Sequence, residues 1–258
     1  LNQFIAGEKI TKDLNPEYGS IQKLHTRDTN LLTLCEDKVL KIQANKDALF
    51  NADGNFNITS TDKFLGSAIA IPGEFGISRN PESFTTYADM CYFCDKNRGT
   101  VMQLKGDTLL PISQVGMSDY FSDTFKVTDI FSILGTYDEK KLDYNVTVTR
   151  GDRFLIESQS TTTWSERSKG WSSFKTFYPE QGLSINNEYY TWKNGSMWQH
   201  HSDAVARSKF YGTSTASGTY PSVTTIFNDN PSSVKSFNTI HYEGSQGRIV
   251  ENDSDNEF

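Results

Sequence analysis

The dipeptide Asn194-Gly195 constrains the fold of this chain more than any other feature of its sequence. It joins two runs rich in aromatic residues, 189–193 and 196–200. Asn-Gly is the strongest short-range signal for a β-hairpin, because a type I′ turn needs positive φ at both of its central residues. The segment therefore predicts two antiparallel strands joined by a tight turn.

A two-residue turn also fixes which residues lie opposite each other. Trp192 is expected to face Met197, and Thr191 to face Trp198. Side chains alternate between the faces of a strand, so large rings fall on both faces of this hairpin. We therefore expect the small sheet to be covered on both sides.

Four further hairpins are predicted by apolar or Thr-rich runs that flank short polar turns. Their turns are centred at residues 36–38, 95–99, 138–141 and 165–170. The last of these and the Asn-Gly hairpin together predict one four-stranded unit over residues 161–201. A helix is predicted only at 117–125, from its apolar spacing, with a short helical turn at 61–66. Two closing strands are expected at 222–227 and 234–242.

Composition agrees with this pattern, since aromatic residues make up 13% of the chain and are typical of strands. A helical bundle and a doubly wound α/β fold are disfavoured. The predicted fold class is all-β, with antiparallel hairpin repeats. A β-propeller-like domain is favoured, because its four-stranded blades are covered on both faces, and a two-sheet β-sandwich is the alternative.

The predicted organisation has three parts. Residues 1–20 form an N-terminal connecting segment, residues 21–250 form the propeller-like domain, and residues 251–258 form an acidic tail or the start of a linker. The chain begins at Leu1 rather than Met, which we interpret as the sign of a fragment or a processed product.

Charge and hydropathy exclude two classes of protein. The net charge is −7, without a basic block, which disfavours tight nucleic-acid binding because that affinity comes mostly from Lys and Arg on phosphates. No apolar run approaches the length of a membrane span. Three cysteines are too few for a disulfide framework and fit folding in a reducing cytosol.

Cys91 and Cys94 form the only C-x-x-C motif, and Cys35 is the only other cysteine. Zinc requires four ligands, usually from two such pairs. Residues three apart on a strand point to opposite faces, so these thiols do not readily share one ion. Structural core cysteines are favoured over a metal or redox site.

Other candidate motifs also favour structural interpretations. His200 and His201 are adjacent and are interpreted as histidines at the edge of a strand. Residues 51–57 resemble half a calcium loop but hold one Asp among Asn residues, so a turn is favoured. Residues 165–171 bear a distant likeness to the Asp-box turn of sialidases, without its Asp. No catalytic arrangement is readable, so we predict that the chain is not an enzyme and needs no cofactor.

Several stretches carry a resemblance to a known family: GISRNPESF (76–84), CYFCDKNRGTVMQL (91–104), PIS (111–113), GMSDYF (116–121), GWSSFK (170–175), PEQGLS (179–184) and SVKSFNTIHYEG (233–244). Together they resemble virion structural proteins of tailed bacteriophages. The most similar type is the tail nozzle or stabilisation (muzzle-type) protein of crAss-like and other short-tailed phages. The resemblance covers roughly residues 70–250.

The resemblance implies a non-enzymatic structural component of the phage virion, assembled in the cytoplasm of the bacterial host. It implies a ring of copies at the tail nozzle or hub, in contact with other tail proteins, through which genomic DNA passes without tight binding. Contact residues are predicted among loop aromatics and Arg: Tyr178, Arg207, Tyr211 and Tyr220. The alternative function is a carbohydrate-binding or sialidase-like propeller of a receptor-binding protein.

Overall fold

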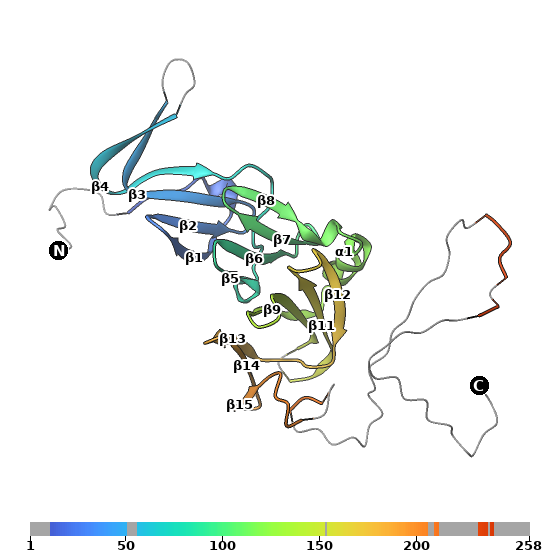
Figure 1. Cartoon of the computed structure of the whole chain (residues 1–258). Coiled ribbons are helices and arrows are strands. Elements are labelled where there is room, and N and C mark those ends of the chain that lie inside the picture. The colour runs from blue at the N-terminus through green and yellow to red at the C-terminus, as the bar shows by residue number, and fades with distance from the viewer. Residues whose placement is uncertain are drawn as a thin grey trace. The chain divides into compact units, whose positions relative to one another are not determined.

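The computed structural model describes residues 11–50, 56–152, 154–205, 209–211, 232–236 and 238–239. The chain divides by its internal contacts into two units, Leu1–Thr219 and Tyr220–Phe258. Every helix and strand described below belongs to the first unit (Figure 1). The predicted tail at 251–258 and the strand at 222–227 lie outside the described residues. Most of the strand predicted at 234–242 does so too, and its described residues are not in a strand.

The described chain folds into four consecutive antiparallel sheets, which we name A to D. In each sheet every strand pairs with its neighbour in sequence. Sheet A contains β1 (Ile21–Arg27), β2 (Asn30–Cys35), β3 (Val39–Phe50) and β4 (Phe56–Ala70). Sheet B contains β5 (Thr85–Tyr87), β6 (Met90–Asp95), β7 (Thr100–Lys105) and β8 (Thr108–Pro111). Sheet C contains β9 (Ile130–Asp138), β10 (Asp143–Gly151), β11 (Ile156–Ser165) and β12 (Gly170–Lys175). Sheet D contains β13 (Gln181–Ile185), β14 (Glu188–Lys193) and β15 (Ser196–Gln199).

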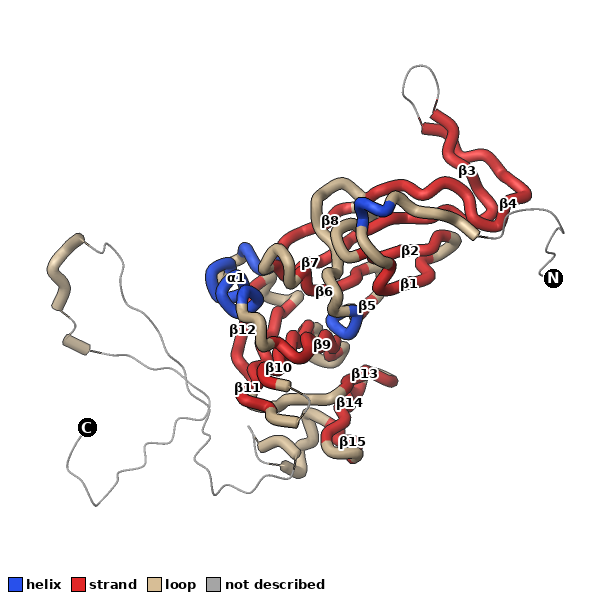
Figure 2. Tube along the Cα trace, turned by 180° about the vertical axis from the view of Figure 1, so that it is seen from behind, coloured by secondary structure: helices blue, strands red, loops and turns tan. Residues whose placement is uncertain are grey.

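Helix is limited to one α-helix and three single turns in the described chain (Figure 2). The α-helix α1 (Ser118–Lys126) confirms the prediction at 117–125, and its buried face carries Phe121 and Phe125. The 3₁₀ turns are η1 (Pro16–Tyr18), η2 (Pro81–Ser83) and η3 (Ile112–Gln114). No helix among the described residues has the length and apolar content needed to cross a membrane. The all-β fold class with hairpin repeats is therefore confirmed.

The Asn-Gly turn forms as predicted. Asn194 has φ of 52° and Gly195 has φ of 73°, as a type I′ turn requires. Trp192 pairs with Met197, and Thr191 pairs with Trp198. The turn chemistry alone was sufficient to fix this register.

The structure corrects two of the predictions about strands. Residues 61–66 belong to β4 rather than to a helical turn, because β4 pairs along β3 through two register shifts and this pairing overrides local propensity. Residues 161–201 do not form one four-stranded unit. Strands β11 and β12 belong to sheet C, whereas β14 and β15 belong to sheet D with β13. Pro179, which has no N–H to donate, lies where the chain leaves β12 and before it begins β13.

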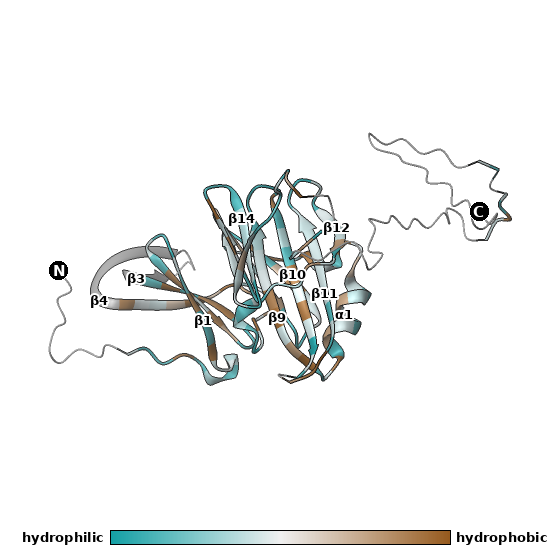
Figure 3. Ribbon diagram, turned by 90° about the horizontal axis from the view of Figure 1, so that it is seen from below, coloured by the Kyte–Doolittle hydropathy of each residue, from teal (hydrophilic) through white to brown (hydrophobic). Residues whose placement is uncertain are grey.

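Sheet B is buried on both of its faces, and strand β6 shows how. Cys91 and Phe93 pack into a cluster with Leu34 of sheet A. The alternate residues, Tyr92 and Cys94, pack into a second cluster with side chains of sheet C. Figure 3 shows both hydrophobic and hydrophilic positions along β9 and β10 of sheet C. Sheets that are covered on both faces in this way are compatible with propeller blades, and a sandwich arrangement is compatible with them too.

Sheets C and D meet at a close approach between β9 and β13. A Cβ added to Gly182 would lie 2.7 Å from Cγ2 of Thr136. The hydroxyl groups of Thr136 and Tyr189 are 2.8 Å apart across the same interface. Because glycine has no Cβ, Gly182 allows sheet D to pack closely against sheet C.

The opposite face of sheet D corrects the prediction that this sheet is covered on both sides. Leu183 and Ile185 are each 50% exposed, and Met197 is 62% exposed. The register places Leu183 opposite Tyr190, on the face that Trp192 and Met197 share. We name this the outer face of sheet D.

Candidate functional site

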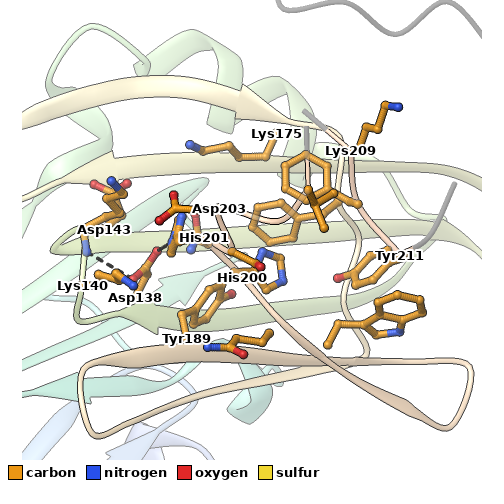
Figure 4. A pocket seen from close by; sticks show the side chains of 18 residues that line it. Asp138, Lys140, Asp143, Lys175, Tyr189, His200, His201, Asp203, Lys209 and Tyr211 are labelled. Carbon is orange, nitrogen blue, oxygen red and sulfur yellow. Dashed lines mark hydrogen bonds and ion pairs between the residues drawn. The ribbon is translucent and has the colours of Figure 1, made fainter. Parts of the chain in front are cut away.

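A cavity of about 1150 Å³ lies where sheet C, sheet D and the chain after β15 meet. Its wall includes the facing ends of β9 and β10, the end of β12, Tyr189 of β14 and residues 198–203, 205 and 209–211. Figure 4 shows the side chains that line it. They divide into an aromatic part and a charged part.

The aromatic part is centred on His200. The His200 ring lies 4.8 Å from the Phe177 ring and 4.8 Å from the Tyr189 ring, measured between centroids. The Phe210 ring lies 5.2 Å from Phe177. Phe177, Tyr189 and His200 are all buried, so they form a packed wall rather than mobile surface rings.

A threonine connects this wall to the rim. Oγ1 of Thr191 lies 2.7 Å from Nε2 of His200 and 3.1 Å from the hydroxyl of Tyr211. Burial lowers the pKa of His200 to about 4, and the neighbouring His201 adds to this effect. The His200 imidazole is therefore neutral at neutral pH. The Trp198 ring packs edge-on against Tyr211 at 5.7 Å.

The charged part is built around two aspartates on neighbouring strands. Asp138 ends β9 and Asp143 begins β10, and they are directly paired in the sheet register. Oδ2 of Asp138 is hydrogen-bonded to Nε2 of His201, and its Oδ1 accepts the backbone N–H of Lys141 at 3.2 Å. Burial raises the pKa of Asp143, while the Ser165 hydroxyl and Lys175 act in the opposite direction.

Lysine side chains complete the charged part, as Figure 4 shows for Lys140, Lys175 and Lys209. Nζ of Lys140 lies 2.9 Å from Oε1 of Glu188. The hydrogen bond from Lys140 lowers the pKa of Glu188. The cavity thus places carboxylate acceptors and ammonium donors beside a wall of aromatic rings.

Two neighbouring carboxylates are also what acid–base chemistry uses. Asp138, however, already accepts hydrogen bonds from His201 and from the Lys141 amide. The arrangement is suited to binding a ligand that both donates and accepts hydrogen bonds and that has an apolar face.

The predicted contact residues do not gather at one place in the described chain. Tyr211 lines the cavity. Tyr178 is half-buried between β12 and β13 and is not part of the cavity wall. Arg207 and Tyr220 lie outside the described residues. Their role in an interface stays a prediction.

The histidines at 200 and 201 have a different place from the one predicted. Strand β15 ends at Gln199, so both histidines follow the strand rather than lying on its edge. His201 adopts a left-handed conformation with φ of 60°, which directs the two rings to different partners, Thr191 and Asp138. The adjacent pair and Tyr211 were the residues singled out in the sequence that line the cavity.

The cysteines lie in the core. Cys91 and Cys94 belong to different hydrophobic clusters on opposite faces of sheet B, as strand alternation predicts. Burial raises the pKa of the Cys91 thiol to about 11 and that of Cys94 to about 12. Among the described residues no group of three His, Cys, Asp or Glu side chains is placed to hold a metal ion.

The segment at 165–171, which faintly resembles an Asp-box, makes the turn between β11 and β12 and ties sheet C to sheet B. Oε1 of Glu166 accepts hydrogen bonds from Nε2 of Gln103 and Nε1 of Trp164, each at 2.7 Å. Burial acts to raise the pKa of Glu166, but hydrogen bonds from Lys169 and Trp164 outweigh it and lower the pKa. Sequence reasoning missed this carboxylate, because its partner Gln103 lies on a distant strand.

The calcium-loop candidate at 51–57 falls mostly outside the described residues, and its last two residues belong to β4.

Comparison with known proteins adds no family: no protein-family model matches the chain, and no curated protein matches it significantly.

Proposed function

We propose that the chain is a non-enzymatic structural component of a tailed bacteriophage virion, part of the nozzle or hub ring of the tail. The observation that carries the proposal is the outer face of sheet D. Sheet B has apolar clusters on both faces, whereas the outer face of sheet D leaves Leu183, Ile185 and Met197 half-exposed or more. Apolar patches of this kind mark protein–protein interfaces.

The fold supports an assembly role as well. The aromatic residues that fill the core are also those enriched in the centres of interfaces. Partly buried Tyr190 and Trp192 lie on the outer face of sheet D beside Met197. The proposed partners are further copies of this chain and other tail proteins.

The charge supports a passage for DNA rather than a tight binding site. The net charge of −7 makes the chain repel the phosphate backbone on average, and dense Lys and Arg contacts would hold DNA in place. The proposed location is the virion, after assembly in the cytoplasm of the bacterial host.

Mass spectrometry of purified particles from the source phage tests this proposal. The chain should be present in a fixed ratio to the portal protein, and Met197→Glu should abolish or strongly reduce its incorporation. Val115→Glu is the matched control, since Val115 is 50% exposed and lies between η3 and α1 rather than in sheet D, and it should be incorporated normally. Absence of the chain from the particle would refute the proposal.

A further inference from the structure

We propose that the cavity between sheet C, sheet D and residues 198–203, 205 and 209–211 binds a neutral saccharide unit of a glycan. This site goes beyond the structural role proposed above and does not depend on it. The cavity, of about 1150 Å³, is somewhat larger than most ligand sites, which commonly measure about 300–1,000 Å³. It therefore has room for more than one sugar ring.

The aromatic wall supplies the first requirement of a saccharide site. The C–H bonds of a pyranose gather on the faces of the ring, and those faces pack well against aromatic rings. Phe177 and Tyr189 are buried around His200 and support the cavity from behind. Trp198 and Tyr211 are partly exposed, line the cavity and pack together at 5.7 Å, so theirs are the rings available to a sugar. Aromatic residues that are already ordered lose little conformational entropy when a ligand binds.

The polar part supplies the second requirement, which is hydrogen bonding in both directions. A sugar hydroxyl both donates and accepts, so it matches a site with carboxylates and ammonium groups side by side. Asp143 offers acceptor oxygens, and Lys175 offers donors next to it. Figure 4 shows both residues on the same side of the cavity.

The balance of charge distinguishes a neutral sugar from a nucleotide. Asp138 is paired with His201, and Lys140 with Glu188. The positive charge of Lys175 acts to lower the pKa of Asp143. Because these charges face opposite charges, the described residues of the cavity create no concentrated positive field of the kind that a polyphosphate requires. A neutral, hydroxyl-rich ligand fits this environment better.

The test is saturation-transfer NMR on the full chain with a panel of neutral probes: glucose, galactose, mannose, N-acetylglucosamine, N-acetylgalactosamine and oligosaccharides of each. We expect transfer to at least one probe. Calorimetry with that probe should show about a tenfold loss of affinity in Trp198→Ala, from the loss of a stacking ring. Tyr211→Phe keeps the ring and the fold but removes the hydroxyl, and it should weaken binding by a smaller factor.

Tyr190→Ala is the matched control, because Tyr190 lies on β14 next to Tyr189 and Thr191 but on the outer face of sheet D. It should bind the probe with unchanged affinity. No transfer to any sugar, binding of ATP in preference to sugars, or equal losses in Trp198→Ala and Tyr190→Ala would each overturn the proposal. Hydrolysis of a bound oligosaccharide would support the saccharide site and refute the non-enzymatic part of the proposed function, so the two proposals fail separately.

Discussion

Gly135 lies in β9 where sheet C meets the η2 turn, and it provides the sharpest test of how closely the sheets approach. A Cβ added at this position would lie 2.0 Å from the carbonyl oxygen of Ser83 and 2.8 Å from the hydroxyl of Tyr144. That hydroxyl donates a buried hydrogen bond to the same carbonyl at 2.9 Å. Gly135→Ala therefore drives a methyl group into an occupied hydrogen bond between two elements.

Two costs add in this variant. Overpacking a buried site costs about 1–3 kcal/mol, and leaving a buried polar group unsatisfied costs about 1–3 kcal/mol. We expect the free energy of unfolding to fall by about 2–6 kcal/mol. For a unit of this size the melting temperature should fall by roughly 5–20 °C.

Urea unfolding followed by far-ultraviolet circular dichroism measures this change. Gly170→Ala is the control, because the nearest atom to its added Cβ is 3.9 Å away, and its stability should change little. Tyr144→Phe removes the hydroxyl, so its combination with Gly135→Ala should cost less than the sum of the single variants. Wild-type stability in Gly135→Ala, or strict additivity in the double variant, would refute this account of the contact between the sheets.

Two further predictions concern the core and the cavity. Phe93→Ala should lower the free energy of unfolding by about 3–5 kcal/mol, because Phe93 is fully buried between sheets A and B; a loss below about 1 kcal/mol in the same urea assay would contradict that packing. The pKa of His200 is lowered to about 4 in the folded chain, below its ordinary value near 6.5, so the unfolded chain binds a proton that the folded chain excludes. The free energy of unfolding should have its full value above about pH 6.5 and should decrease by up to about 3 kcal/mol as the pH falls toward 4. His200→Gln should flatten this pH dependence. An unchanged pH profile in that variant would show that His200 is not the group responsible.

Local features of the fold were predictable because they depend on local chemistry. Asn194 and Gly195 specify a turn whose geometry few other dipeptides adopt, so the register of β14 and β15 followed directly. The helix around Phe121 and Phe125 followed in the same way from residue spacing. Such elements need no knowledge of distant partners.

The grouping of strands into sheets was not predictable in the same way. Strand β12 closes sheet C by pairing with β11, and β13 begins a new sheet. β4 likewise depends on pairing with β3 through two register shifts. These outcomes depend on contacts between segments far apart in the chain, which turn signals do not encode.

The cavity could not be predicted from the sequence for a related reason. Asp138 and Asp143 appear in the sequence as ordinary residues flanking a turn, and Phe177 as part of a strand. Their common site exists only because residues 198–203, 205 and 209–211 line one cavity together with sheets C and D. The adjacent His200 and His201 were noticed, but their partners could be identified only from the fold.

Cryo-electron microscopy of the source virion tests the central claim most directly. The account predicts a ring of tail density into which the four-sheet unit fits, with the outer face of sheet D buried against a neighbouring subunit at Leu183 and Met197. A reconstruction of the complete tail with no density for this unit, or one in which that face is exposed to solvent, would contradict it.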